Sequence, residues 1–198
     1  LQMPNWFEYL LCFHGIRFAG GVVVQVGSDW RSTEMAYGFG IGPAKAAIIP
    51  KDFHGYDYPS ALRDLLPGLP ELKHIIVARG AAPDGTLSLD ELLADPIEER
   101  VLIETLRACR PGPDQVIRIV FTSGTTGLPK GIVQTHRVRQ HWSFSNAVDM
   151  RFHVNCRAMT TTALYSNGTW LMVLPALFAG GTVVVMPEFS PGEFLQTV

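Results

Sequence analysis

Short runs of apolar and β-branched residues recur along the chain, separated by longer stretches with helical or turn character. They occupy residues 22–26, 46–49, 74–78, 116–121 and 182–185. Runs of this kind are typical of strands that are buried on both faces, as they are in parallel sheets. Because strands alternate with helical segments, the sequence predicts an α/β fold with parallel sheets flanked by helices.

The composition supports a folded domain. Apolar residues make up 47% of the 198 residues and charged residues 17%, which excludes a disordered tail, a charged coiled coil and a collagen-like rod. A formal net charge of −2 argues against a protein that binds nucleic acid by neutralising phosphates. Cys12, Cys109 and Cys156 are odd in number and widely spaced, so we expect no disulfide framework and a reducing, cytoplasmic location.

Residues 158–187 carry no charge and are long enough to cross a bilayer. They also contain several threonines, Asn167, Pro175 and the pair Gly180-Gly181, which favours a buried helix, a glycine turn and a buried strand. No basic segment precedes an apolar run near Leu1, so we expect no signal peptide and no transmembrane span.

A helix–glycine turn–strand pattern occurs near both ends. The first copy has a predicted helix over 6–13, with Asn5 as N-cap and Glu8 completing a capping box, and then Gly20-Gly21 before a strand. The second has a predicted helix over 171–178, followed by Gly180-Gly181 and another strand. The repeat suggests two similar α/β halves.

Several other patterns have ordinary structural interpretations. The acidic stretch 88–106 is typical of a solvated helical surface, and the Pro/Gly-rich segment 110–114 breaks the chain after it. The spacing of Gly38, Gly40 and Gly42 does not fit a dinucleotide-binding motif and favours a glycine-rich turn. The motif His153-x-x-Cys156 has no second pair at metal-ligand spacing.

The segment with the clearest chemical character is 122–131, Thr-Ser-Gly-Thr-Thr-Gly-Leu-Pro-Lys-Gly, directly after a predicted strand. Glycines let backbone N–H groups approach a ligand, hydroxyls donate to phosphate oxygens, and Lys130 adds a positive charge. Because the spacing is not that of the usual P-loop, we predict a polyphosphate-binding loop of another kind.

Residues 119–136 closely resemble the signature loop of the AMP-forming adenylating enzymes. That family includes acyl-CoA and aryl-CoA synthetases, adenylation domains of nonribosomal peptide synthetases, and firefly-type luciferases. The likeness extends to 4–26 and 163–189. It implies part of the family's layered αβαβα N-terminal domain, with one α/β piece over 1–115 and a second over 116–198, and with the C-terminal domain beyond this sequence.

The resemblance also implies a reaction. These enzymes join a carboxylic acid to ATP as an acyl-adenylate and most then transfer the acyl group to a thiol, so ATP, Mg²⁺ and coenzyme A are the expected cofactors. Lys130 would counter the developing charge as the catalytic residue, and Thr126 would reach the metal. The residues expected to bind the β- and γ-phosphates are Thr122, Ser123, Gly124, Thr125, Thr126, Gly127 and Lys130.

The same resemblance places the acid pocket at Tyr165, Ser166, Asn167 and Gly168, where Ser166 stands at a position that is often histidine in relatives. The aromatic and small residues of this segment favour an apolar acid, such as the substrate of an acyl-CoA or aryl-CoA ligase, and the segment has no acidic residue to hold the ammonium group of an amino acid. A peptide-synthetase-type adenylation domain, luciferase-like chemistry and a non-catalytic nucleotide-binding relative stay open. The family's adenine contacts, metal-binding glutamate and C-terminal lysine would lie beyond Val198, so we expect this piece alone to be inactive.

Overall fold

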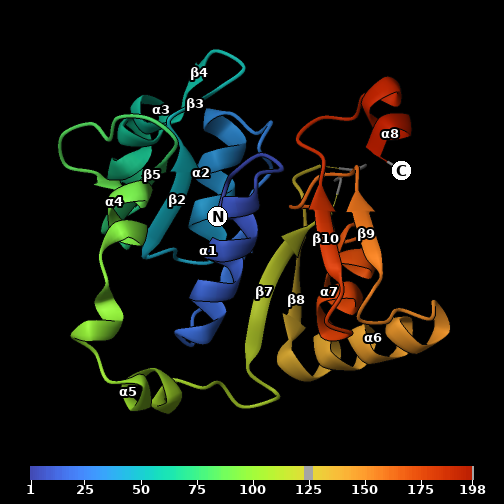
Figure 1. Ribbon diagram of the computed structural model, residues 1–198. Helices are drawn as coiled ribbons and strands as arrows, with labels where there is room; N and C mark the ends of the chain where they lie inside the picture. The colour runs from blue at the N-terminus through green and yellow to red at the C-terminus, as the bar shows by residue number, and fades with distance from the viewer. Residues whose placement is uncertain (123–126, 198) are drawn as a thin grey trace.

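The computed structural model describes residues 1–122 and 127–197, which form a layered α/β structure (Figure 1). The helices are α1 (Phe7–Phe18), α2 (Ser32–Ile41), α3 (Tyr58–Leu65), α4 (Leu89–Ala94), α5 (Ile103–Ala108), α6 (His136–Asp149), α7 (Trp170–Phe178) and α8 (Pro191–Thr197), with short 3-10 helices at Leu66–Gly68 and Ile97–Glu99. The strands are β1 (Val23–Gln25), β2 (Ala46–Pro50), β3 (Asp52–Phe53), β4 (Tyr56–Asp57), β5 (His74–Ala78), β6 (Leu87–Ser88), β7 (Val116–Phe121), β8 (Gly131–Thr135), β9 (Arg157–Thr160) and β10 (Thr182–Val185).

Most strand pairs are parallel, which confirms the predicted fold class. Strands β2, β5 and β6 form one parallel sheet, β9 and β10 form another, and β1 pairs in parallel with β7. Strand β8 is antiparallel to β7, because a short loop returns the chain directly alongside the strand that it leaves. The β1–β7 pair joins the segment before residue 115 to the segment after it.

Residues at the start of the chain connect two of these sheets. The Gln2 amide donates to the Ile48 carbonyl at 3.0 Å, and the Val26 amide donates to the Leu1 carbonyl at 3.0 Å. The segment therefore lies between β1 and β2, as the central position of the N-terminus in Figure 1 shows.

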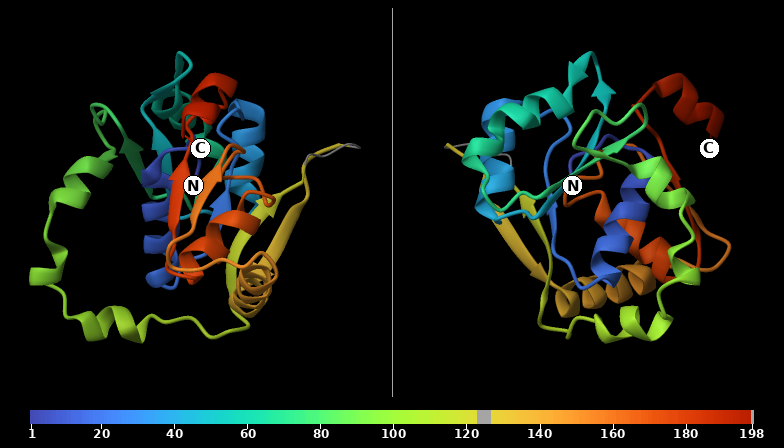
Figure 2. Two further views of the ribbon diagram at one scale, coloured as in Figure 1. Left: turned by 45° about the vertical axis from the view of Figure 1, so that its right-hand side comes forward. Right: turned by 90° about the vertical axis from the view of Figure 1, so that its left-hand side faces the viewer.

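Two apolar clusters hold the layers together. In the first, α1 packs against α7, with ring centroids of Phe13 and Trp170 4.1 Å apart. The second lies among α2, α3, β2 and β5 and includes Phe39, Ile49 and Tyr58, all at most 1% exposed. In Figure 2 the segment from α4 to α5 runs outside this body.

The repeated glycine turns are confirmed in detail. Gly20 and Gly180 have φ values of 78° and 76°, a left-handed conformation that glycine adopts without strain. In both copies the next glycine amide donates to a carbonyl five residues earlier, at 2.8 Å to Ile16 and at 2.8 Å to Ala176. Each turn thus ends its helix in the same way and directs the chain into a strand.

Two local predictions are wrong, and a third, the solvated helical surface over 88–106, is refined. The first helix begins at Phe7 with Trp6 as N-cap, because the Asn5 side chain is engaged with a distant segment. Helix α2 continues through Gly38 and Gly40, where a turn was expected; a Cβ at Gly38 would lie 3.0 Å from the Trp30 ring, so close packing explains that glycine. The exposed stretch 88–106 is divided into α4, a 3-10 turn and the start of α5, with Pro96 at the break.

The uncharged stretch 158–187 forms β9, a series of turns, α7 and β10. Among the described residues, no helix has the length and apolar character needed to cross a membrane.

Candidate nucleotide and acid site

The predicted phosphate loop connects two strands of a β-hairpin. The Thr122 amide donates to the Lys130 carbonyl at 3.0 Å, and the Lys130 amide donates to the Thr122 hydroxyl at 3.1 Å. These two bonds close the base of the loop. Ser123, Gly124, Thr125 and Thr126 lie outside the described residues, so their phosphate and metal roles stay predictions.

The described part of the loop faces solvent. Lys130 is exposed, and Gly127 is exposed with a φ of 148°, which residues with a side chain rarely adopt. The left view of Figure 2 shows the β7–β8 hairpin extending outward from the body toward this loop. Lys130 is thus accessible to a ligand.

The predicted acid pocket is a turn that distant residues hold in place. The Asn5 side chain donates to the Thr162 carbonyl at 2.9 Å and accepts from the Leu164 amide at 2.8 Å. The Trp170 indole donates to the Leu164 carbonyl at 2.6 Å. Trp170 is fully buried, so it anchors the turn from within the core. We call residues 163–168 the acid turn.

A buried arginine joins the hairpin to the acid turn. Arg118 on β7 is 0% exposed and donates to Gln134 on β8 at 2.7 Å, to Gln25 on β1 at 2.7 Å and to Asn167 at 2.5 Å. The side-chain amide of Gln134 also donates to Asn167, at 3.2 Å. The stem of the phosphate loop and one predicted acid-pocket residue therefore belong to a single hydrogen-bond network.

The acceptors around Arg118 are neutral amide oxygens. Burial, followed by the nearby positive charge of Arg139, lowers the pKa of Arg118 to about 9, so the guanidinium stays protonated at neutral pH. Burial and a side-chain hydrogen bond from Gln25 act in opposite directions on Tyr9, and burial prevails, so its pKa is raised. Gln25, Arg118 and Gln134 were not identified as site residues from the sequence, although each is a polar residue within an apolar strand.

The loop and the acid turn follow strands that point the same way. In Figures 1 and 2, β7, β9 and β10 end toward the same side of the molecule, although β7 belongs to one sheet and β9 and β10 to another, and the acid turn follows β9. Ligands of parallel α/β sheets bind at the carboxyl ends of the strands. The segment after β1 reaches this side too, since the rings of Trp30 and Phe121 lie 5.0 Å apart.

Tyr165 lies near Asp29, an acidic residue from a distant part of the chain. Burial, then the nearby Asp29 carboxylate, raises the pKa of Tyr165 to about 12, so the phenol is neutral. Ser166 and Asn167 are half-buried, and Gly168 is exposed. Of the predicted acid-pocket residues, the structure thus connects Asn167 to the hairpin and sets Tyr165 beside Asp29.

The described residues supply no metal site of their own. Within 1–122 and 127–197, no group of three or more His, Cys, Asp or Glu side chains could hold a metal ion. Mg²⁺ prefers oxygen ligands and commonly keeps waters and substrate phosphates.

Comparison with known proteins decides the family, since the AMP-binding enzyme model matches residues 1–198. The chain belongs to this family of AMP-binding enzymes. It is 30% identical to 2,3-dihydroxybenzoate-AMP ligase of Bacillus subtilis, over 98% of this chain and 34% of the relative. It is 26% identical to 4-coumarate–CoA ligase 2 of Solanum tuberosum, over 100% of this chain and 35% of the relative.

The fold agrees with this membership. The anthranilate CoA ligase AuaEII, solved with anthranoyl-AMP, superposes with a TM-score of 0.75 at 18% identity, covering 95% of this chain and 35% of that one. This AMP-binding chain spans little more than a third of the length of these relatives. The resemblance of the sequence to adenylate-forming enzymes is thereby confirmed.

Proposed function

We propose that this chain is part of an enzyme that activates a carboxylic acid with ATP and transfers the acyl group to a thiol, most simply coenzyme A. The observation that carries the proposal is the hairpin that ends in the phosphate loop and is bonded through Arg118 to the acid turn. That arrangement connects a candidate triphosphate site after β7 to a candidate acid site after β9, although the two strands belong to different sheets. Family membership and the ligases among the relatives support it.

The chemistry assigned to these residues is electrostatic. A carboxylate oxygen forms a bond to the α-phosphorus of ATP, and the bond from that phosphorus to pyrophosphate breaks. Both reactants are negative, so positioning and charge neutralisation provide most of the rate enhancement. Lys130 would stabilise the departing pyrophosphate, the loop hydroxyls would bind its oxygens, and Mg²⁺ would neutralise phosphate charge. The thiol sulfur then attacks the acyl carbon and AMP leaves.

The acid is proposed to be apolar or aromatic, because the Tyr165 phenol is neutral. Asn167 offers no free charge either, since its oxygen accepts from Arg118 and Gln134. Asp29 beside Tyr165 provides a specific reason to test the alternative, an adenylation domain that recognises an amino acid. An ammonium group would need such a carboxylate. Acids with and without an α-amino group distinguish the two.

The decisive experiment measures AMP formation by the longest chain that the gene encodes, with ATP, coenzyme A and a panel of acids. Lys130→Met should lower the rate by roughly 100-fold or more, as loss of a transition-state charge partner does elsewhere. Lys45→Met, at another exposed lysine, is the control. Equal rates for wild type and Lys130→Met would disprove the role of Lys130.

Two further outcomes separate the alternatives. ATP binding without AMP formation from any acid would favour a non-catalytic nucleotide-binding relative. We also expect residues 1–198 alone to show no ATP–pyrophosphate exchange, because the family's remaining catalytic groups would be missing. Exchange by this piece would refute that expectation.

A further inference from the structure

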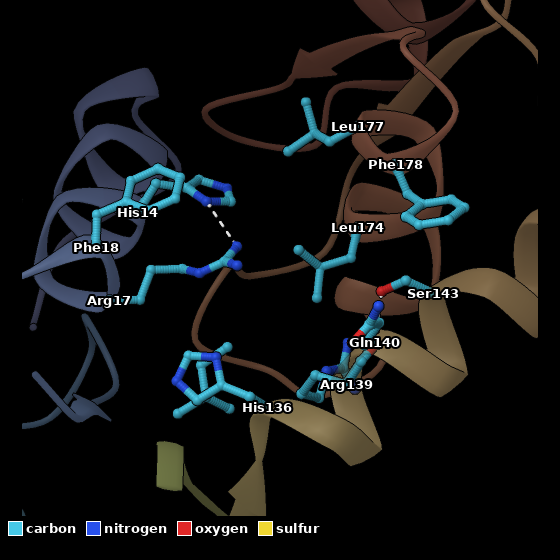
Figure 3. A pocket seen from close by; sticks show the side chains of 11 residues that line it. His14, Arg17, Phe18, His136, Arg139, Gln140, Ser143, Leu174, Leu177 and Phe178 are labelled. Atoms are coloured by element: carbon cyan, nitrogen blue, oxygen red, sulfur yellow. Dashed lines mark hydrogen bonds between the residues drawn. The ribbon is translucent and has the colours of Figure 1, made fainter. Parts of the chain in front are cut away.

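A cavity of about 500 Å³ lies between α1, α6 and α7, apart from the phosphate loop and the acid turn (Figure 3). Ile117, near the start of β7, forms part of its lining, whereas the phosphate loop follows the other end of that strand. The volume falls in the range of about 300–1,000 Å³ that is common for small-molecule sites. Lys130 and residues 165–168 are absent from its lining.

The polar side of the cavity is basic. His14 and Arg17 come from α1, and His136 and Arg139 come from α6. No Asp or Glu lines the cavity, and among the described ion pairs neither arginine has a carboxylate partner. Figure 3 shows Arg17 reaching from α1 into the space between this helix and α6 and α7.

Several buried nitrogen atoms in this lining have no hydrogen-bond partner within residues 1–122 and 127–197. They are His14 Nε2, His136 Nε2 and Arg139 Nε. Arg139 is only 3% exposed, and the one hydrogen bond of its side chain in the described structure goes to the Trp170 carbonyl at 3.3 Å. Buried polar groups are normally paired, so three unpaired nitrogen atoms around one cavity are unusual, and an acceptor in the cavity would pair with them once their side chains turn toward it.

The identity of these atoms points to an acceptor. Arg17 can only donate, so in its 3.1 Å contact His14 Nδ1 is the acceptor. Burial, then the Arg17 charge, lowers the pKa of His14 to about 4, so the ring is neutral at pH 7 and its proton is on Nε2. His14 Nε2 and Arg139 Nε are therefore both unpaired N–H donors, and Arg17 adds a second guanidinium charge to the same lining.

The opposite wall is apolar. Leu174 and Leu177 from α7 point toward His14 and Arg17 in Figure 3, and Phe178 completes the apolar lining. A phosphate dianion would leave oxygens against these side chains without hydrogen bonds, at a cost. A ligand with one anionic group and a hydrocarbon body would satisfy both walls.

We propose that this cavity is a binding site for an amphiphilic organic monoanion, a carboxylate with a short hydrocarbon body, separate from the acid turn. The carboxylate accepts from Arg17, Arg139 and His14, and the hydrocarbon body packs on Leu174 and Leu177. The proposal is independent of the proposed ligase activity.

The test is a calorimetric titration of the longest chain with octanoate, with octanol and inorganic phosphate as comparison ligands. Arg17→Gln should weaken octanoate binding roughly 10-fold or more, the usual effect of losing a charge-assisted hydrogen bond. Arg137→Gln is the matched control, since Arg137 is an exposed residue of α6 paired with Asp114. It should leave binding unchanged.

Each alternative has its own outcome. Octanol binding as tightly as octanoate, or octanoate binding that Arg17→Gln leaves unchanged, would overturn the proposal. Phosphate binding as tightly as octanoate would make this an inorganic-anion site. Binding abolished by Asn167→Ala but retained by Arg17→Gln would place octanoate at the acid turn instead.

Discussion

Replacing Arg118 with methionine tests the network that connects the phosphate hairpin to the acid turn. Methionine fills a similar volume but cannot donate, so Gln25 Oε1 and Gln134 Oε1 lose their guanidinium partner. Asn167 Oδ1 keeps the weaker bond from Gln134. Each orphaned acceptor costs about 1–3 kcal/mol, and relief of guanidinium desolvation offsets part of the sum.

We expect Arg118→Met to lower the free energy of unfolding by about 2–4 kcal/mol, a large share of the roughly 5–15 kcal/mol typical of domains. Urea denaturation followed by tryptophan fluorescence measures it. Arg137→Met, at an exposed ion pair, should cost at most about 1 kcal/mol. An Arg118→Met variant as stable as wild type would refute the assignment of Arg118 as the group that satisfies these amides.

A second variant separates lost hydrogen bonds from lost packing. Arg118→Leu combined with Gln25→Leu and Gln134→Leu removes the main acceptors together with the donor. If orphaned acceptors cause the loss, this variant should recover at least half of the stability lost by Arg118→Leu alone. No recovery would mean that packing around the side chain dominates.

Three more predictions concern other parts of the structure. Arg79→Met removes the two hydrogen bonds, at 2.7 and 2.9 Å, that the Arg79 guanidinium donates to the buried Glu8 carboxylate. It should lower the free energy of unfolding by about 3–5 kcal/mol. A loss of less than about 1 kcal/mol in urea denaturation would contradict this. Gly27→Ala sets a Cβ 2.7 Å from a carbon of the Trp30 indole and should lower the free energy of unfolding by about 1–3 kcal/mol. Gly68→Ala, which has open space around it, should leave the stability close to that of wild type. Equal thermal midpoints for the two variants would refute the clash at Gly27. The pKa of His14 is lowered to about 4 in the folded chain. Between about pH 6.5 and pH 4 the unfolded chain therefore binds a proton at His14 and the folded chain does not. The free energy of unfolding should fall as the pH drops through this range. His14→Gln should flatten that slope in denaturation curves, and an unchanged slope would show that His14 is not its source.

Strands made of an uninterrupted apolar run were the most predictable part of the fold, whereas β3, β4, β6, β8 and β9 were not expected. The expected bounds of β5, β7 and β10 agree with the structure, because a buried strand flanked by turns needs an uninterrupted apolar run. The glycine turns after α1 and α7 were equally predictable, since their left-handed conformation is a local property.

Features that depend on distant contacts were not predictable in this way. Asn5 has the sequence pattern of an N-cap, yet its amide is used by residues more than 150 positions away. Gly38 suggested a turn, but the nearby indole requires a residue without a side chain inside a helix. In each case a tertiary contact outweighed a local preference of about 1 kcal/mol.

The candidate site shows the same division. The loop was recognisable because its chemistry lies in consecutive residues, whereas the network around Arg118 combines single residues from three strands and one turn. The local signals were single polar residues within apolar runs, of which Arg118 in 116–121 is the charged one. Its partners emerge only from the pairing of β1, β7 and β8.

Strand β7 carries both Arg118 and, just after its last residue, Thr122. Since a strand rises about 3.3 Å per residue, these positions are ~13 Å apart along one stiff element. A nucleotide that shifts the hairpin must therefore shift the guanidinium that holds Asn167. Coupling between two binding sites is reciprocal, so the acid would change the affinity for nucleotide by the same factor as the nucleotide changes the affinity for the acid. Cooperative binding of the two substrates would then originate in the backbone of a single strand.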